Sequence, residues 1–266
     1  LFESEVKQAY QAEALLRGTM RARTNVAGNT VKFPKIGKGV ATVRVPQTDV
    51  TPLNVTYSQV TATLTDYIAA EYSDIFQQSH INFDERRELV TVVSKSIARR
   101  MDQICIDALV AASGASTVAT GIGGATTNMN LAKLRATAKA LNLKNVPSED
   151  RYLLMHASQL DALLGEAEVT SADYAAVKAL VRGEINSFMG FNILTMGDRD
   201  EGGVPKPSTR TCFAWHKDAL GYAESMAQKT EVNYVPEKTS FLVSSMFSAG
   251  AVSIDDEGIV AISCTE

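Results

Sequence analysis

One stretch of the sequence, residues 82–114, constrains the fold more than any other because it predicts a single long helix. Asn82 and Glu85 have the spacing of a capping box, and Gly114 suits the end of a helix. A helix of this length exceeds what a compact domain usually needs, so we predict a strut that supports other elements. Apolar residues recur at steps of three and four, which forms one stripe that must pack on another layer; they are Val90, Val93, Ile97, Met101, Ile104, Ala108 and Ala112.

Charge is divided unevenly along the chain. Residues 1–48 hold eight Lys or Arg against three acids, a local net charge of +5, although the whole chain has a net charge of −4. A basic segment on an acidic body is typical of nucleic-acid binding, and equally of a subunit whose N-terminal segment lies on another copy. Composition does not separate these two interpretations.

Cysteine usage and hydropathy indicate an ordinary intracellular chain. The three cysteines are far apart and odd in number, which argues against a disulfide framework and favours synthesis in a reducing compartment. No apolar run approaches the roughly 18 residues of a membrane span, and the N-terminus has no signal-peptide pattern. The chain begins with Leu1, so we expect that some N-terminal sequence is missing.

Three elements are predicted before the long helix. Residues 3–20 have the spacing of a peripheral helix. Residues 30–46 read as an irregular β-hairpin, with strands around Val31 and Phe33 and around Val43 and Val45. This hairpin has little apolar surface, so it should project and be held by a neighbour. A long strand then returns over residues 53–72, with a bulge at residues 58–59.

Residues 116–226 alternate between helical and strand patterns, which predicts a mixed α/β domain. The remainder, residues 232–264, is almost entirely strand apart from an acidic turn at residues 255–258. The expected helices of the α/β domain span residues 131–141, 160–164 and 174–181, and its expected strands span residues 151–156, 191–196, 211–215 and 219–224.

Residues that carry catalytic or metal chemistry are sparse. His80, His156 and His216 have no partner at metal-ligand spacing, and Cys212 with His216 lacks the second pair that a zinc site needs. Residues 198–209 begin like a calcium loop but lack its acidic final ligand. The acidic cluster at residues 255–257 reads as a solvated turn. We therefore predict no cofactor, no metal and no catalytic residues.

The order of parts and four short motifs resemble the major capsid (coat) protein of tailed bacteriophages, in its podovirus-like form. The order is a basic arm, a projecting hairpin, a long return strand, a strut helix, an α/β domain and returning strands. The motifs are residues 28–37 (GNTVKFPKIG), 99–109 (RRMDQICIDAL), 189–194 (MGFNIL) and 215–221 (WHKDALG). Singly these motifs are weak signatures and in combination they are good ones, and the resemblance as a whole covers nearly the whole chain.

The resemblance implies an α+β chain with the Hong Kong-type capsid fold. Its implied parts are an N-terminal arm, an extended loop built on a β-hairpin, a peripheral domain that contains the spine helix 82–114, and an axial α/β domain. Their residues would be 1–28 for the arm, 29–67 for the extended loop, 68–115 with 227–266 for the peripheral domain, and 116–226 for the axial domain.

The resemblance also implies a structural function. Such a protein self-assembles as hexamers and pentamers into an icosahedral phage head around double-stranded DNA, without sequence-specific binding. Its partners would be itself, a scaffolding protein, the portal and decoration proteins; it would assemble in the bacterial cytoplasm without a membrane. Charged residues on the arm, hairpin and helix become candidates for contacts between subunits, namely Arg17, Arg21, Arg23, Lys32, Lys35, Lys38, Arg44, Arg99, Arg100 and Asp102.

Two alternatives stay open at the level of sequence. An encapsulin-like protein compartment has a related fold and would be distinguished by a co-purified cargo enzyme. A hydrolase that uses residues 116–226 is the alternative from another class. Its distinguishing sign would be a Ser or Cys, a His and an Asp that converge in a pocket.

Overall fold

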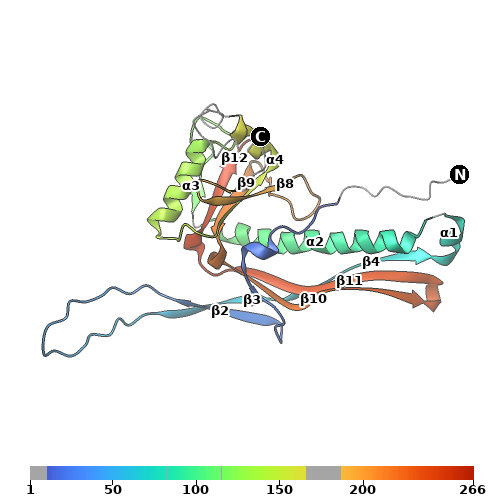
Figure 1. Ribbon diagram of the computed structural model, residues 1–266, viewed down its shortest axis with the longest axis horizontal. Coiled ribbons are helices and arrows are strands. Elements are labelled where there is room, and N and C mark those ends of the chain that lie inside the picture. The colour runs from blue at the N-terminus through green and yellow to red at the C-terminus, as the bar shows by residue number, and fades with distance from the viewer. Residues whose placement is uncertain (1–10, 82, 115, 166–186) are drawn as a thin grey trace.

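The long helix predicted from the sequence is present and organises the molecule (Figure 1). In the computed structural model, which describes residues 11–81, 83–114, 116–165 and 187–266, it is α2 and spans Glu85–Ala112. Its 28 residues correspond to about 42 Å at about 1.5 Å per residue. α2 lies along one face of a long sheet, and a more compact α/β unit covers its C-terminal half from the other side.

The start of α2 differs from the prediction. Asp84 caps the helix, because its carboxylate accepts a hydrogen bond from the N–H of Arg87. Asn82, the predicted cap, lies outside the described residues. The carboxylate of Glu85 instead accepts a 2.7 Å hydrogen bond from the Ser73 hydroxyl on the preceding strand. The predicted capping-box role of Glu85 is therefore wrong, and this side chain joins the helix to the sheet.

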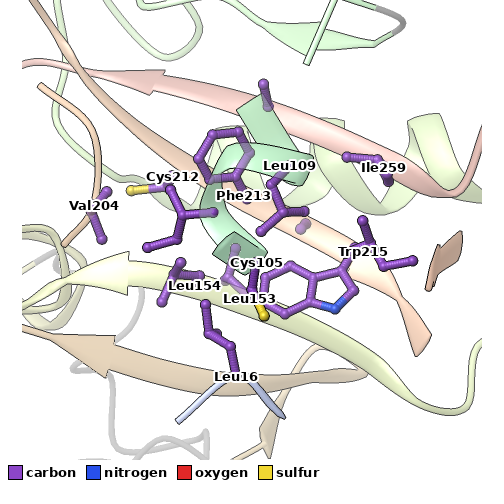
Figure 2. Packing of buried hydrophobic residues seen from close by; sticks show 14 of the residues in the cluster. Leu16, Cys105, Leu109, Leu153, Leu154, Val204, Cys212, Phe213, Trp215 and Ile259 are labelled. Carbon is purple, nitrogen blue, oxygen red and sulfur yellow. The ribbon is translucent and has the colours of Figure 1, made fainter. Parts of the chain in front are cut away.

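α2 is buried on two sides, whereas the sequence predicts one stripe. The predicted stripe is confirmed, with Val90 half-buried and its other members buried. The second buried side arises because the α/β unit packs there, and Cys105 and Leu109 lie among Phe213 and Trp215 of that unit (Figure 2). The residues of this second side are Asp102, Cys105, Ile106 and Leu109.

A four-stranded sheet supports the first side of α2. Its strands alternate side chains between two faces, so Tyr67 and Phe247 point to the helix and stack with ring centroids 5.2 Å apart. Arg100 of α2 lies over the Tyr67 ring at 4.5 Å. A short helix, α1 (Ile75–His80), connects this sheet to α2. In spatial order the strands are β1 (Arg21–Arg23), β10 (Leu220–Val235), β11 (Ser240–Ser253) and β4 (Thr65–Asp74).

The projecting hairpin is present, but its second strand is not the predicted one. β2 (Thr30–Ile36) pairs antiparallel with β3 (Tyr57–Thr63), and residues 37–56 between them contain no strand. The pairing of Phe33 with Val60 belongs to a face that the body buries in part, whereas Val43 and Val45 are exposed. The predicted bulge at residues 58–59 is also wrong, because the break comes at Leu64, between β3 and β4, where the chain changes sheets.

Two glycines form the seat on which the hairpin base rests. The Phe33 ring is fully buried over Gly221, where an added Cβ would lie 2.8 Å from the ring. The backbone of Thr63 crosses Gly250, where an added Cβ would lie 2.1 Å from the Thr63 carbonyl oxygen. The hairpin base therefore contributes to a small core that it shares with Ala223 and Ile254 of the body, consistent with the expectation that the hairpin has little core of its own.

The α/β unit is a six-stranded mixed sheet with helices α3 (Leu131–Leu143) and α4 (Ala157–Leu164) packed against it. Its core includes the fully buried Trp215, whose indole N–H donates to the carbonyl oxygen of Thr19 at 3.1 Å. The strands in spatial order are β5 (Thr117–Val118), β12 (Ile259–Cys264), β9 (Arg210–His216), β6 (Arg151–His156), β8 (Phe191–Met196) and β7 (Ser187–Phe188).

The two sheets divide the C-terminal strands differently from the predicted boundary at residue 226. β10 begins at Leu220 and belongs entirely to the four-stranded sheet. The last strand, β12, returns to the six-stranded sheet, where it pairs with β9 and β5. Residues 259–264 thus do not join the long sheet. The predicted helix over residues 174–181 lies outside the described residues.

The N-terminal segment is not the predicted helix over residues 3–20. Residues 3–10 lie outside the described part, and residues 11–16 are irregular. A single 3₁₀ turn covers Arg17–Thr19, and the fully buried Leu16 and nearly buried Met20 insert into the main core on either side of it. Within the described ranges, no helix has both the length and the apolar character needed to cross a membrane.

Replacing Gly250 with Ala is expected to destabilise the subunit by about 1–3 kcal/mol, because the new Cβ collides with backbone that cannot move independently of two sheets. Equilibrium unfolding in urea measures this change. Gly18→Ala is the matched control, because no atom lies within 4 Å of its added Cβ, and it should change stability by less than about 0.5 kcal/mol. Equal stability of both variants would mean that the hairpin is not seated at Gly250.

Candidate functional site

The tip of the projecting hairpin, residues 37–56, presents apolar side chains to solvent. The Val43 side chain is 93% exposed, although a β-branched residue gains stability from burial. Singly exposed apolar residues are ordinary, but five on one loop make this loop a candidate contact surface. We call residues 37–56 the loop tip; its exposed apolar residues are Val40, Val43, Val45, Val50 and Leu53.

The face of the four-stranded sheet that points away from α2 carries a second apolar surface. Ile68 is 68% exposed and lies opposite Met246, and the exposed Tyr72 lies opposite Leu242. These four side chains alternate with Tyr67 and Phe247 along the strands, so they occupy the outer face. Cross-strand apolar pairs in this position stabilise a sheet further when a partner covers them. We infer that this face is a candidate contact surface.

The predicted basic residues of the N-terminal segment lie beside β10. Arg17 pairs with Glu224 at 2.7 Å, and the Glu224 side chain is only 2% exposed. Arg21 and Arg23 are exposed on β1, and the Arg23 guanidinium lies 5.3 Å from the centroid of the Phe33 ring. Arg17 therefore compensates a buried carboxylate within the chain, whereas Arg21 and Arg23 remain accessible to a partner.

The predicted lysines of the hairpin do not share one environment. Lys35 forms a 2.8 Å ion pair with Asp255, and Lys38 forms a 2.6 Å ion pair with Glu257. Both partners belong to the acidic turn between β11 and β12. Lys32 and Arg44 are exposed, the former on β2 and the latter in the loop tip.

Asp102 of α2 connects three parts of the chain. Its carboxylate is 0% exposed and accepts hydrogen bonds from the N–H groups of Leu15 and Leu16, each at 3.1 Å. Arg199 donates to the same carboxylate at 2.8 Å. Burial raises the pKa of Asp102 above its usual value, although the two N–H groups and the guanidinium oppose this shift. The prediction of an intersubunit role for Asp102 is wrong, because its side chain is fully enclosed.

The neighbouring polar residues of α2 hold the loop that follows β8. Arg100 forms a 2.7 Å ion pair with Glu201, and Gln103 accepts a 2.8 Å hydrogen bond from the N–H of Gly202. Arg99 is half-buried and donates weakly to Gln11 at 3.4 Å. The polar stripe of α2 therefore fastens the α/β unit and the N-terminal segment to the helix within one subunit.

Sequence reasoning missed the acidic partners in these contacts. Glu224, Asp255, Glu257 and Glu201 are all partners of predicted basic residues, yet each lies more than 100 positions away in the chain. No local spacing links such pairs. The only available signal was the opposite charge of the N-terminal segment and the body.

A serine, a histidine and an aspartate meet at one end of the six-stranded sheet. His156 Nδ1 lies 2.7 Å from Ser158 Oγ, and His156 Nε2 lies 3.2 Å from Asp198 Oδ1. However, His156 Nδ1 accepts the N–H of Ser158 as the cap of α4. The adjacent cleft of about 310 Å³ is lined by Asp198 and Arg210 but by neither Ser158 nor His156. The His156 side chain in this arrangement is the N-terminal cap of α4.

Glu266 completes this cluster. Its carboxylate contacts Lys206 and Arg210 and accepts a hydrogen bond from Ser158 at 3.2 Å. Hydrogen bonds from Lys206 and Arg210 lower the pKa of Glu266 to about 2, against the opposing effect of burial. The cluster thus ties the last residue of the chain to the loop after β8. Within the described residues, no group of three His, Cys, Asp or Glu could hold a metal ion.

Comparison with known families gives one match. The sequence model of a family described as phage capsid protein matches residues 1–266, the full length of the chain. No curated protein matches the chain in sequence.

Solved structures share the fold across almost the whole chain. The capsid structure of the cyanophage P-SCSP1u aligns with a TM-score of 0.79 at 15% identity, covering 100% of this chain and 92% of that one. A structure from Mycobacterium phage Che8 aligns with a TM-score of 0.76 at 16% identity, covering 98% and 95%. The acidic stable capsid structure of Helicobacter pylori bacteriophage KHP30 gives 0.76 at 12% identity, covering 99% and 94%. The predicted fold class is confirmed.

Replacing Asp102 with Ala is expected to destabilise the subunit by about 3 kcal/mol or more, because Arg199 and two backbone N–H groups lose their buried acceptor. Thermal unfolding, together with proteolysis of the N-terminal segment, measures the effect. Asp107→Ala is the matched control, because Asp107 is exposed on the same helix. If both variants unfold like the unmodified protein, Asp102 does not hold these parts together.

Proposed function

The chain belongs to the phage capsid protein family, and from this membership we propose how its subunit builds the shell of a phage head. It is a major capsid protein that forms that shell, and its location is the capsid of the virion. The observation that carries this conclusion is the family match over all 266 residues. The family matched is that of phage capsids, which favours this function over an encapsulin-like compartment.

We propose that the subunits associate as hexamers and pentamers that close into an icosahedral shell. Rotationally symmetric contacts generate closed rings, and rings of two orders can tile a closed surface. The loop tip and the outer face of the sheet support this arrangement, because both offer apolar surface that a single subunit leaves in water. We assign the loop tip to the contact with a neighbouring subunit.

The two sheets suggest how the predicted domains are divided. We propose that α2 with the four-stranded sheet forms the peripheral domain and that the six-stranded sheet with α3 and α4 forms the axial domain. This assignment keeps residues 1–28 as the arm and residues 29–67 as the extended loop. It moves residues 220–226 to the peripheral domain and residues 259–264 to the axial domain, since these follow their own sheets.

The remaining partners are proposals that rest on the family. We propose that the shell encloses double-stranded DNA without reading its sequence, and that a scaffolding protein, a portal and decoration proteins take part in assembly within the host cytoplasm. The net charge of −4 fits a container wall, because strong phosphate binding requires clustered Lys and Arg. We also propose that the protein has no catalytic activity, in agreement with the helix-capping role of His156.

Removing the loop tip tests the proposed contact. The shortened hairpin replaces residues 38–55 with Asn-Gly, a two-residue turn that fits between Gly37 and Thr56, whose backbones already pair at 2.8 Å. A deletion that began at residue 30 would also remove Phe33 and damage the core. The subunit should keep its helical circular-dichroism signal and its melting temperature, whereas closed shells should be absent by electron microscopy.

A milder variant provides the control for loop length. Replacing Val40, Val43 and Val50 with Asn keeps the loop but removes its apolar surface, so it should reduce shell yield in the same direction. Normal shells from the shortened protein would show that the loop tip makes no necessary contact.

A further inference from the structure

The acidic turn between β11 and β12 faces the point where the extended loop leaves the body. Asp255 pairs with Lys35 at 2.8 Å, and Glu257 pairs with Lys38 at 2.6 Å. The third acid, Asp256, accepts a hydrogen bond from the Ser253 hydroxyl and so closes the turn itself. By sequence this turn reads as a solvated connection. In the structure, two of its three carboxylates contact the hairpin.

The turn is anchored firmly enough to act as a fixed support. The N–H groups of Ile254 and Asp255 both donate to the carbonyl oxygen of Ala219, at 2.8 and 3.2 Å. Ile254 is buried in the small core beneath the hairpin. Gly258 is also buried, and an added Cβ there would lie 2.7 Å from the Ala219 side chain. The two carboxylates therefore occupy set positions relative to both sheets.

The two ion pairs hold the hairpin at points further along it than the place where its base rests on the body. Phe33 sits over Gly221 at the base, and Lys35 lies two residues further along β2. Lys38 follows just after Gly37, the last residue whose backbone pairs across the hairpin. A two-stranded ribbon is marginally stable and twists readily when it is held at one place only. A second support near the end of the paired strands therefore restricts the direction of the loop tip.

We propose that the acidic turn, residues 255–257, sets the direction in which the extended loop leaves the subunit. Lys35 and Lys38 are then positioning residues for assembly, and they do not contact a neighbouring subunit. Of the basic hairpin residues predicted to contact another subunit, Lys32 and Arg44 remain candidates for that contact. This inference rests on the proposed function, because the direction of the loop matters only if the loop tip contacts another copy.

The strength of the support is modest and depends on salt. Both pairs are partly exposed, and exposed ion pairs contribute little and weaken further as the salt concentration rises. Hydrogen bonding to Glu257 raises the pKa of Lys38 above its usual value. Reversing both lysines replaces attraction with repulsion, which should lower the population of the held direction by about three- to tenfold.

The direction of the loop can be measured in the unassembled full-length subunit. Spin labels on V43C and K139C report the distance from the loop tip to α3; the native cysteines, Cys105, Cys212 and Cys264, are buried and are not labelled. Pulsed electron paramagnetic resonance should give one narrow distribution of the distance between the two labels in the otherwise unmodified protein. Adding K35E and K38E should broaden this distribution and lower the population at the original distance by about three- to tenfold.

Charge exchange supplies the matched control. Adding D255K and E257K to K35E and K38E restores opposite charges at both contacts and returns the chain to its original net charge. This fourfold variant should recover both the narrow distribution and closed shells, whereas each twofold variant should form few closed shells. A fourfold variant that behaves like the twofold ones would overturn the inference, as would normal shells from K35E with K38E.

The outcomes separate this inference from the proposed function. If the shortened hairpin prevents shells while the charge-reversed protein assembles normally, the inference fails and the contact by the loop tip stands. If the shortened hairpin itself assembles normally, the proposed contact fails and the inference fails with it. If shells are lost by charge reversal and regained by charge exchange, the acidic turn directs the loop.

Discussion

The burial of α2 from two sides is the interaction on which the rest of the structure depends. One side packs on the four-stranded sheet, and the other receives the core of the α/β unit, including Phe213 and Trp215. The buried Asp102 of α2 also binds the N-terminal segment, through the N–H of Leu16, and the loop after β8, through Arg199. Because only the C-terminal half of the helix is covered twice, the molecule is thick where the α/β unit lies and thin on both sides of it, along the hairpin and along the N-terminal half of α2 (Figure 1).

This shape leaves surfaces that a single chain cannot bury. The long sheet has a layer on one face only, and the loop tip extends beyond both sheets with apolar side chains in water. In an isolated protein these features would be liabilities for stability and solubility. In a subunit of a closed shell we expect them to be interfaces, since obligate assemblies obtain much of their stability from contacts between copies. The hairpin has both kinds of surface: its base packs against the subunit's own core, whereas its tip stays exposed.

Local patterns in the sequence predicted the parts that local forces determine. The stripe from Val93 to Ala112 and strands β6 and β8 follow from periodicity, and the structure has them. Patterns failed where distant residues decide the outcome. Leu16 has helical spacing in the sequence but is not in a helix, because its backbone N–H donates to Asp102. Strand β12 joins the six-stranded sheet because it pairs with β9. The acidic turn had no visible role, because its lysine partners lie more than 200 positions away.

In the proposed assembly, the loop tip completes its burial against a neighbouring copy in the shell. Electron cryomicroscopy of assembled particles, at a resolution that shows side chains, tests this claim most directly. We predict that Val43, which is 93% exposed in the subunit, is covered by another subunit at every position in the shell. A map in which residues 40–53 face solvent on all copies would contradict the account.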